Sequence, residues 1–311
     1  MTGSSVDQVV AFRLNEIPLL SRSALGRAEE LRSDTEALRA GWAESLLLRV
    51  NRRGQVRVRD DSLVFSDATE LGLEPEPGAV FLGVREDRHV WTVRVPALTG
   101  ELADLRALGG VLDDADAGLL TSALAMLNWH DSAGFSALDG AVSVPTMSGW
   151  SRISTSTGHE EFPRTDPAII CLVHDDGDRV LLARQPTWPP RRYSLLAGFV
   201  EAGESLEACV AREIKEEVGL DVRDVRYLGS QPWPFPRSVM IGFAAVGDPD
   251  VSFTFSDGEI AEARWFSRDE VRSALELGDW ASDGDAPLLL PGSISIARGI
   301  IESWVQSAAT S

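Results

Sequence analysis

Three glutamates crowd into five positions of the segment "AREIKEEVGL", which covers residues 211–220. Glu213, Glu216 and Glu217 are spaced i, i+3 and i+4, so on a helix they fall within about 100° of one face. All three should be ionised at pH 7, because a glutamate has a reference pKa near ~4.3. The segment therefore predicts either a helix surface that faces water or a seat for hard divalent cations such as Mg²⁺ or Mn²⁺.

The residues around this acidic helix form a longer pattern, which favours the cation seat. From Gly198 the chain runs five residues to Glu204 and seven more to "REIKEEVGL" at residues 212–220. This arrangement resembles the Nudix box, GX5EX7REUXEEXGU, in which U is an aliphatic residue, and every constrained position matches. With ordinary residue usage, such a match arises by chance with odds on the order of one in a million or below.

The resemblance implies a metal-dependent hydrolase that acts on a nucleoside diphosphate linked to another group. Bound Mg²⁺ or Mn²⁺ neutralises the anionic diphosphate in such enzymes, holds its geometry and acidifies a bound water. The resemblance also implies that Glu213, Glu216 and Glu217 are catalytic, and it leaves open whether Glu216 or Glu217 activates the water. The implied metal ligands are the backbone carbonyl near Ala197, Glu213, Glu217 and Glu259.

The same resemblance gives structural roles to other residues of the box. Arg212 is expected to pair with Glu204 and to fix the loop–helix–loop shape. Gly198 would let a strand end approach the metals closely, and Gly219 suits the left-handed position that ends a helix. The apolar i, i+4 row that is expected to face the core consists of Leu206, Val210 and Ile214.

A second motif, "SQPWPFPRS" at residues 230–238, follows the box along the chain. Its three prolines fix φ and remove backbone donors, so the segment should be a stiff, extended loop. Such a loop either covers the core as a structural turn or holds Trp233 and Phe235 ready to stack on flat heterocycles. The motif resembles the SQPWPFPxS array of the NADH pyrophosphatase (NudC-type) subfamily of Nudix hydrolases, and every specified position matches.

The subfamily resemblance implies hydrolysis of NADH or NAD⁺ to nicotinamide mononucleotide and AMP. It also implies removal of an NAD cap from RNA to leave a 5′-monophosphate, because the same bond joins cap and transcript. Arg106 is a candidate phosphate contact, with an ordinary surface arginine as the alternative. The substrate contacts implied by family position are Phe162, Phe199, Gln231, Pro232, Trp233, Pro234, Phe235, Pro236, Arg237, Ser238 and Ala297.

Many members of the family carry four zinc-binding cysteines between two domains, and this sequence departs from that pattern. The corresponding positions here are Ser136, Asp139, Ser154 and Thr157. None of them is a soft zinc ligand, so no structural zinc is expected. Hydrogen bonds among these side chains and the backbone are expected to keep the path of the segment instead. His130 and His159 flank it without cysteine partners and are not expected to bind zinc.

The order of strand-like and helix-like segments predicts an α/β protein. An N-terminal α+β domain is expected over residues 1–128. Residues 129–164 are rich in Ser, Thr, Gly and Asp, as in a linker, and take the place of the degenerate zinc ribbon. The Nudix domain is expected as an α/β/α sandwich with a mixed sheet over residues 165–311, ending in a helix.

Local patterns predict several individual elements of these domains. Residues 45–60 and 79–95 each have strand composition on both sides of a turn, which favours two hairpins. An apolar helix is expected at 114–130, and a further hairpin at 168–184. Ser267 and Glu270 have the spacing of a capping box, which predicts the start of another helix.

Composition limits the partners and the compartment. With a net charge of −19 the chain should be a poor general binder of DNA or RNA, because neutralising phosphates takes Lys and Arg. Any RNA should therefore be held mainly at its terminal dinucleotide, with weak salt dependence. Cys171 and Cys209 are the only cysteines, so no disulfide framework is possible. The chain shows no signal peptide and no membrane span, so a cytoplasmic protein with no DNA or membrane partner is expected.

The family resemblance implies a homodimer. The apolar helix at 117–127 and the small N-terminal strands are candidate interface pieces, although core positions give the same pattern. Two other functions stay as alternatives. A broader Nudix hydrolase would prefer ADP-ribose or diadenosine polyphosphates, against which the intact second motif argues. A Nudix-like sensor would bind a nucleotide without cutting it, but such sensors usually lose glutamates that this sequence retains.

Overall fold

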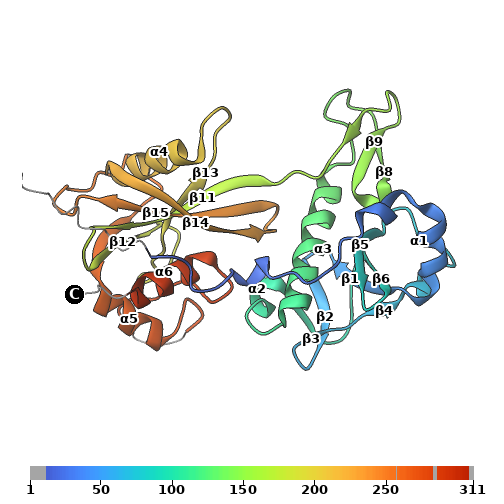
Figure 1. Cartoon of the computed structure of the whole chain (residues 1–311), viewed down its shortest axis with the longest axis horizontal. Coiled ribbons are helices and arrows are strands. Elements are labelled where there is room, and N and C mark those ends of the chain that lie inside the picture. The colour runs from blue at the N-terminus through green and yellow to red at the C-terminus, as the bar shows by residue number, and fades with distance from the viewer. Residues whose placement is uncertain (1–11, 257, 283–285, 308–311) are drawn as a thin grey trace, which may run out of the picture. The chain divides into compact units, whose positions relative to one another are not determined.

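The computed structural model describes residues 12–256, 258–282 and 286–307, which form two compact units (Figure 1). The N-terminal unit contains Leu19–Asp166 together with the short segment Pro232–Val239. The C-terminal unit contains Pro167–Gln231, the chain from Met240 onward, and the described residues up to Pro18. The polar segment 129–164 therefore folds as part of the N-terminal unit.

The C-terminal unit is built on a six-stranded sheet in the order β14-β15-β11-β12-β16, with β13 beside β11. The neighbours of β11 and β12 run antiparallel to them where the register is defined. The elements are β11 Asp166–His174, β12 Arg179–Arg184, β13 Leu196–Phe199, α4 Leu206–Val218, β14 Val222–Trp233, β15 Ser238–Gly247, β16 Glu262–Ser267, α5 Arg268–Leu277 and α6 Ile296–Gln306.

Helices cover both faces of this sheet because its central strands are apolar on both sides. In β11, Ile170 and Leu172 belong to the core cluster that includes α5 and α6. The alternating residues Ile169 and Cys171 belong to a second cluster, which includes α4. Figure 1 accordingly shows α4 on one side of the sheet and α5 with α6 on the other. This three-layer arrangement confirms the predicted α/β/α sandwich.

Two local predictions for this unit are also confirmed. Strands β11 and β12 form the expected antiparallel pair, with Val173 opposite Leu181. The capping box is present at the start of α5: the Ser267 hydroxyl accepts from the Glu270 amide, and the Glu270 carboxylate accepts from the Ser267 amide.

The N-terminal unit contains a four-stranded sheet in the order β4-β1-β6-β5 and two three-stranded sheets, β3-β2-β7 and β10-β9-β8. Its strands are β1 Leu46–Asn51, β2 Gln55–Arg59, β3 Ser62–Leu63, β4 Ser66–Asp67, β5 Val80–Arg85, β6 Arg88–Val95, β7 Leu102–Asp104, β8 Ser143–Thr146, β9 Ser151–Ser154 and β10 Glu160–Glu161. Its helices are α1 Thr35–Gly41, α2 Leu105–Leu108 and α3 Asp114–Ser132, with 3₁₀ turns at Leu19–Ser21, Glu29–Ser33, Trp42–Glu44, Ala68–Glu70 and Met147–Gly149.

One of the two N-terminal hairpin predictions is confirmed and the other is wrong. Strands β5 and β6 pair antiparallel, as expected for residues 79–95. The stretch 45–60 does form two strands around a turn, but they join different sheets. Strand β1 pairs with β4 and β6, whereas β2 pairs with β3 and β7. Local alternation predicts a strand without specifying its partner, which long-range packing decides.

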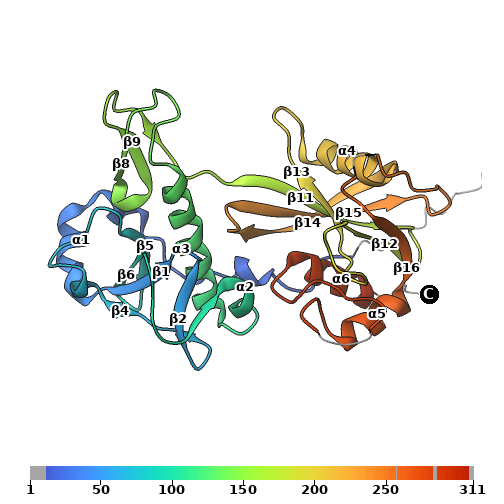
Figure 2. The ribbon, with the colours of Figure 1, turned by 180° about the vertical axis from the view of Figure 1, so that it is seen from behind.

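Helix α3 is the predicted apolar helix, and it packs along β5 and β6 inside the N-terminal unit (Figure 2). Its apolar side chains are buried within this one chain, as in a helix that is hydrophobic all round. The suggestion that residues 117–127 offer a dimer interface is therefore wrong. Within the described ranges, no helix combines the length and the apolar character that crossing a lipid bilayer demands.

Candidate active site

Helix α4 carries the three glutamates of the acidic segment and is bounded as the sequence predicts. The Ser205 hydroxyl caps its first turn by accepting from the Ala208 amide, and Gly219 ends it with a left-handed φ of 76°. Val210 and Ile214, from the apolar row, are fully buried against the sheet. Because Val210 and Ile214 face the sheet, the rotation of the helix about its own axis is set, and with it the direction in which each glutamate points.

The glutamates differ strongly in exposure. Glu217 has only 3% of its surface exposed. The side chain of Glu213 is 13% exposed, whereas that of Glu216 is 54% exposed. Glu213 and Glu217 therefore lie against the protein, and Glu216 faces solvent. A buried carboxylate destabilises the fold unless a cation or hydrogen-bond donors compensate its charge. Glu213 and Glu217 therefore need such partners.

Arg212 is a positively charged residue next to the glutamates of α4, and its predicted pair with Glu204 is present. Its Nη2 lies 2.6 Å from Glu204 Oε1 and its Nε 3.1 Å from Oε2. The pairing with Arg212 lowers the pKa of Glu204 to about 2 and raises the pKa of Arg212. The sequence did not predict two further contacts of Arg212: its Nη1 donates to Glu213 Oε1 at 2.9 Å and to Glu216 Oε2 at 3.0 Å.

Gly198 lies where strand β13 meets the carboxylate of Glu213. A Cβ added at Gly198 would lie 1.9 Å from the carboxyl carbon and 2.1 Å from both oxygens of Glu213. No side chain can occupy that space while Glu213 keeps its position. The sequence predicts an approach of this strand end to metals; the structure shows an approach to the Glu213 carboxylate, and the approach to metals stays a prediction. The neighbouring Ala197 lies opposite Ile170 of β11.

Further negative charges surround Glu213. Burial raises the pKa of its carboxyl group, Arg212 opposes that shift, and the charges of Glu216 and Glu259 add to it. Glu259 lies in an exposed loop far along the chain from α4. The fold thus brings Glu259 into the electrostatic neighbourhood of Glu213, which the spacing of the box alone does not predict.

The donor atoms present suit a divalent cation in their chemistry. Carboxylate and carbonyl oxygens are the ligands that Mg²⁺ and Mn²⁺ prefer, and the Glu213 carboxylate fills the space beside Gly198 at the strand end. No three Asp, Glu, His or Cys side chains in the described part of the chain are already arranged around an ion. Arg212 pairs with one oxygen each of Glu213 and Glu216, so it partly compensates their charge in this arrangement.

The aromatic loop, which we define as Pro232–Ser238, belongs to the N-terminal unit. The rings of Trp233 and Phe235 pack edge to face, with centroids 4.9 Å apart. The guanidinium carbon of Arg106 lies 3.9 Å from the Phe235 ring centroid and 5.3 Å from that of Trp233. Arg106 is thus a cation stacked on this aromatic pair, and burial lowers its pKa.

The other predicted substrate contacts lie in different settings. Phe199, in the C-terminal unit, and Phe162, in the N-terminal unit, are exposed aromatic residues, at 61% and 63%. Gln231 is fully buried, and its Nε2 donates to the carbonyl of Ile294 at 2.6 Å. Ala297 is buried in the first turn of α6. The two phenylalanines are therefore exposed, whereas the side chains of Gln231 and Ala297 serve the core.

The four positions expected to take the place of zinc-binding cysteines make hydrogen bonds within the polar segment. Asp139 Oδ2 accepts from the hydroxyls of Ser154 at 2.7 Å and Thr157 at 2.6 Å, and Oδ1 accepts from the Ala141 amide. These hydrogen bonds, led by that of Thr157, lower the pKa of Asp139 to about 2. The Ser136 hydroxyl donates to Glu161. The predicted hydrogen-bonded path is present.

His130 is engaged by other groups. Its Nε2 lies 2.7 Å from the carbonyl oxygen of Gly149, and its Nδ1 lies 2.9 Å from Nη1 of Arg152. Burial lowers the pKa of its imidazole, and the charge of Arg152 acts in the same direction. Both ring nitrogens are therefore occupied by contacts that hold the polar segment to α3.

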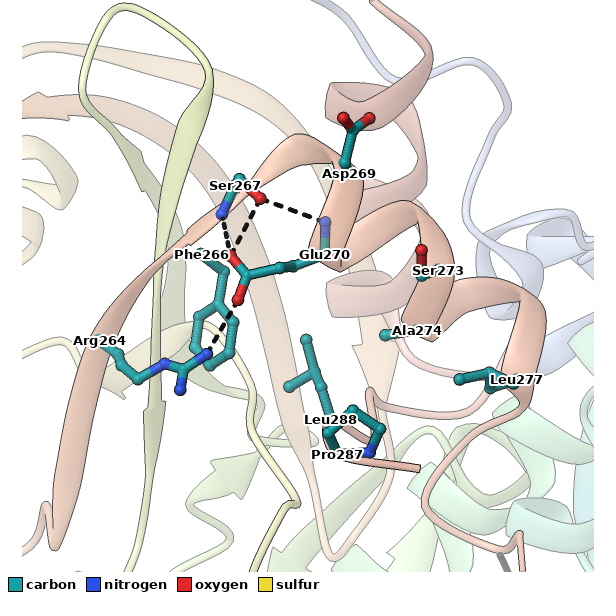
Figure 3. A pocket seen from close by; sticks show the side chains of 10 residues that line it. All are labelled: Arg264, Phe266, Ser267, Asp269, Glu270, Ser273, Ala274, Leu277, Pro287 and Leu288. Carbon is teal, nitrogen blue, oxygen red and sulfur yellow. Dashed lines mark hydrogen bonds and ion pairs between the residues drawn. The ribbon is translucent and has the colours of Figure 1, made fainter. Parts of the chain in front are cut away.

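A cavity of about 390 Å³ lies elsewhere in the C-terminal unit (Figure 3). Two of its charged groups pair with each other: Arg264 Nη2 donates to Glu270 Oε1 at 3.1 Å, while Glu270 Oε2 serves the capping box of α5. The third, Asp269, pairs with Arg272 outside the lining. None of its lining residues belongs to the acidic box or to the aromatic loop. We therefore place the candidate active site at the acidic helix.

Comparison with protein families supports this placement. Residues 164–286 match the NUDIX domain. Residues 24–129 match the NADH pyrophosphatase-like rudimentary NUDIX domain. The two matches cover the C-terminal unit's acidic box and most of the N-terminal unit.

Similar proteins extend over nearly the whole chain. The NAD-capped RNA hydrolase NudC of Mycobacterium tuberculosis is 61% identical over 303 residues, which are 95% of this chain and 97% of that protein. The NudC protein of Mycobacterium bovis gives the same figures. Human mitochondrial NAD(P)H pyrophosphatase NUDT13 is 39% identical over 214 residues, 67% of this chain and 60% of that protein. The chain therefore belongs to the Nudix hydrolases, in the NudC-type subfamily of NADH pyrophosphatases and NAD-capped RNA hydrolases.

Proposed function

We propose that this protein hydrolyses the diphosphate bond of NADH and NAD⁺, giving nicotinamide mononucleotide and AMP. The same hydrolysis removes NAD caps from RNA and leaves 5′-monophosphate ends. The observation that carries the proposal is the approach of the Gly198 main chain to Glu213, on a helix that also buries Glu217. The names of the relatives, NAD-capped RNA hydrolase and NAD(P)H pyrophosphatase, supply the substrate class.

The cofactor of this proposal is Mg²⁺ or Mn²⁺, with no structural zinc. A divalent cation, when bound, neutralises the diphosphate and lowers the pKa of a water beside it. Arg212 keeps its pair with Glu204 when Glu213 turns toward the cation. The residues proposed to hold the cation are Glu213, Glu217 and Glu259, with the carbonyl of Ala197.

A carboxylate of α4 is proposed to accept the proton of the attacking water. Glu216 and Glu217 are the two candidates. Glu216 is open to solvent, so it can exchange the proton with bulk water after each turnover. Glu217 is buried, so its carboxylate lies on the protein side of the helix.

Aromatic faces are proposed to hold the flat rings of the dinucleotide. Trp233 and Phe235 are the proposed faces on the aromatic loop. Phe162, in the same unit, and Phe199, in the C-terminal unit, are further exposed candidates. A stacked ring gains apolar burial without ordering many rotatable bonds. Main-chain and polar groups of Gln231, Pro232, Pro234, Pro236, Arg237, Ser238 and Ala297 complete the proposed contacts.

A homodimer in the cytoplasm is part of the proposal. The polar segment exposes four apolar side chains of the kind that a second copy would cover: Phe135 at 67%, Leu138 at 66%, Val142 at 53% and Val144 at 39%. Contiguous exposed apolar side chains favour association. Substituting Phe135 and Leu138 by Ser should convert a dimer to a monomer in a solution mass measurement, and an unchanged mass would exclude this surface.

The function is tested by incubating the protein with Mg²⁺ or Mn²⁺ and NADH, NAD-capped RNA or ADP-ribose in parallel. The Glu217→Gln variant should lower kcat at least ~10²-fold, the scale of losing a major electrostatic or acid–base contribution. Glu207→Gln is the matched control, since Glu207 is exposed in the first turn of the same helix. A clear preference for ADP-ribose, or binding of NAD without cleavage, would contradict the proposal.

A further inference from the structure

The aromatic loop has few main-chain groups with which to hold its shape. Pro232, Pro234 and Pro236 lack an N–H, so they can be anchored only through their carbonyl oxygens. One internal bond runs from the Phe235 amide to the Trp233 carbonyl at 2.7 Å. The presentation of the two aromatic rings therefore depends on donors that reach the loop from outside it.

Asn128, near the end of α3, supplies two of these donors. Its Nδ2 donates to the carbonyl of Pro234 at 3.0 Å and to that of Pro236 at 2.8 Å. A carboxamide nitrogen carries two hydrogens, and both are used here. The two carbonyls flank Phe235, so one side chain holds the main chain on both sides of that ring.

Arg94 fixes the orientation of this carboxamide. Its Nη2 donates to Asn128 Oδ1 at 2.8 Å, and its Nη1 donates to the carbonyl of Asn51 at 2.9 Å. Nη2 also pairs with Asp131 at 2.8 Å, and only 15% of the Arg94 side chain is exposed. A reversed carboxamide would turn its donors toward the guanidinium and its oxygen toward two carbonyls, so it is excluded.

The rings themselves are held by other contacts. Arg106 stacks on Phe235, and Trp233 packs against its edge. The end of the loop is tied by Asp166, whose amide donates to the Arg237 carbonyl at 2.9 Å and whose carboxylate accepts from Arg237 Nε at 2.8 Å. Asn128 is therefore the anchor of the middle of the loop.

We infer that Asn128 is a positioning residue for substrate binding, which acts through the carbonyls of Pro234 and Pro236 and holds Trp233 and Phe235 in the geometry that stacks the dinucleotide rings. This inference rests on the proposed function for its substrate. It predicts that the KM for NADH depends on Asn128, whereas kcat depends on the acidic helix.

Two variants test the inference. Asn128→Ala removes both donors, and Asn128→Asp keeps the shape but turns carboxylate oxygens toward two carbonyls. Both should raise the KM for NADH on the order of 10-fold, the scale of losing two hydrogen bonds, with kcat changed less than about threefold. Ser132→Ala is the matched control, because the Ser132 hydroxyl donates only to carbonyls of its own helix, at Asn128 and Trp129. A purely structural role would lower thermal stability and active fraction without raising KM.

Amide hydrogen exchange at Trp233, Phe235 and Arg237, measured without substrate, tests the anchoring separately. Exchange should accelerate in Asn128→Ala and stay unchanged in Ser132→Ala. If the wild-type protein does not cleave NADH, the proposed function fails, while the exchange rates still decide whether Asn128 holds the loop. A wild-type KM together with wild-type exchange in both Asn128 variants would overturn the inference.

Discussion

Arg212 and Glu204 are joined by two hydrogen bonds, with Nη2 2.6 Å from Oε1 and Nε 3.1 Å from Oε2. The remaining Nη1 faces Glu213 and Glu216. Arg212 is thus shared between one carboxylate that anchors it and two carboxylates near the proposed cation. We expect the balance among these partners to affect how readily the acidic helix binds a metal.

Glu204→Gln should weaken metal binding. The amide keeps the shape of the side chain but loses its charge, so Arg212 should pair more strongly with Glu213 and Glu216. We expect the Mg²⁺ concentration for half-maximal activity to rise about 10-fold, the scale of one charge-assisted hydrogen bond. An activity titration with Mg²⁺ measures this shift. Glu201→Gln, at an exposed position of the same loop, is the control, and equal metal dependence in both variants would refute the expectation.

Gly198→Ala should lower the activity but leave the thermal stability nearly unchanged. The added Cβ would overlap the Glu213 carboxyl group at 1.9–2.1 Å, but that group ends a flexible side chain and can be displaced. We therefore expect kcat to fall about 10²-fold, as for a lost electrostatic group, with little change in Tm. Kinetics and thermal melting measure the two effects. Gly134→Ala, where a Cβ meets nothing within 4 Å, should change neither.

The acidic helix could be predicted from sequence because its determinants are local. Ser205 and Gly219 bound the helix through contacts with its own turns, and the i, i+4 row sets its buried side. The Arg212–Glu204 pair spans only eight residues, within the same loop–helix unit. Spacing along the chain is sufficient for such features.

The remaining features depend on contacts between distant parts of the chain. Strands β1 and β2 alternate like a hairpin, yet each finds its partners elsewhere. The all-round apolar pattern of α3 fits both a core and an interface, and only the fold shows that it is core. Asn128 has no motif of its own, because its partner carbonyls lie 106 and 108 residues away. Glu259 likewise reaches Glu213 only through folding.

Divalent cations should stabilise the folded protein. A ligand that binds only the folded state adds about 2.7 kcal/mol at a concentration of ~100 times its Kd. We expect Mg²⁺ or Mn²⁺ to raise the Tm of the wild type and chelation to reverse the effect. The double variant Glu213→Gln/Glu217→Gln should lose the shift, whereas Glu207→Gln should keep it. A similar shift in the double variant would place the cation elsewhere.

Asp139 should make the polar segment acid-sensitive. Its pKa is about 2 in the folded protein and 3.8 in the reference state, so the ionised carboxylate stabilises the fold. That contribution is complete above pH ~4 and is lost as the pH falls toward ~2. The Tm of the wild type should therefore exceed that of Asp139→Asn at pH 7, and the gap should close near pH 2. Melting curves across this range test the assignment, which a gap independent of pH would contradict.

RNA binding should depend only weakly on salt. The chain has 48 Asp and Glu against 29 Lys and Arg, and this acidic excess argues against a continuous phosphate track, so the terminal dinucleotide should provide most of the contacts. Each neutralised phosphate of a single strand contributes about −0.7 to the slope of log K against log salt concentration. We expect a slope no steeper than about −2 for NAD-capped RNA, measured by anisotropy with Glu217→Gln to prevent cleavage. Uncapped RNA of the same sequence is the control and should bind more weakly. A markedly steeper slope would require an extended basic surface. It would overturn the prediction that this acidic protein binds the cap rather than the transcript.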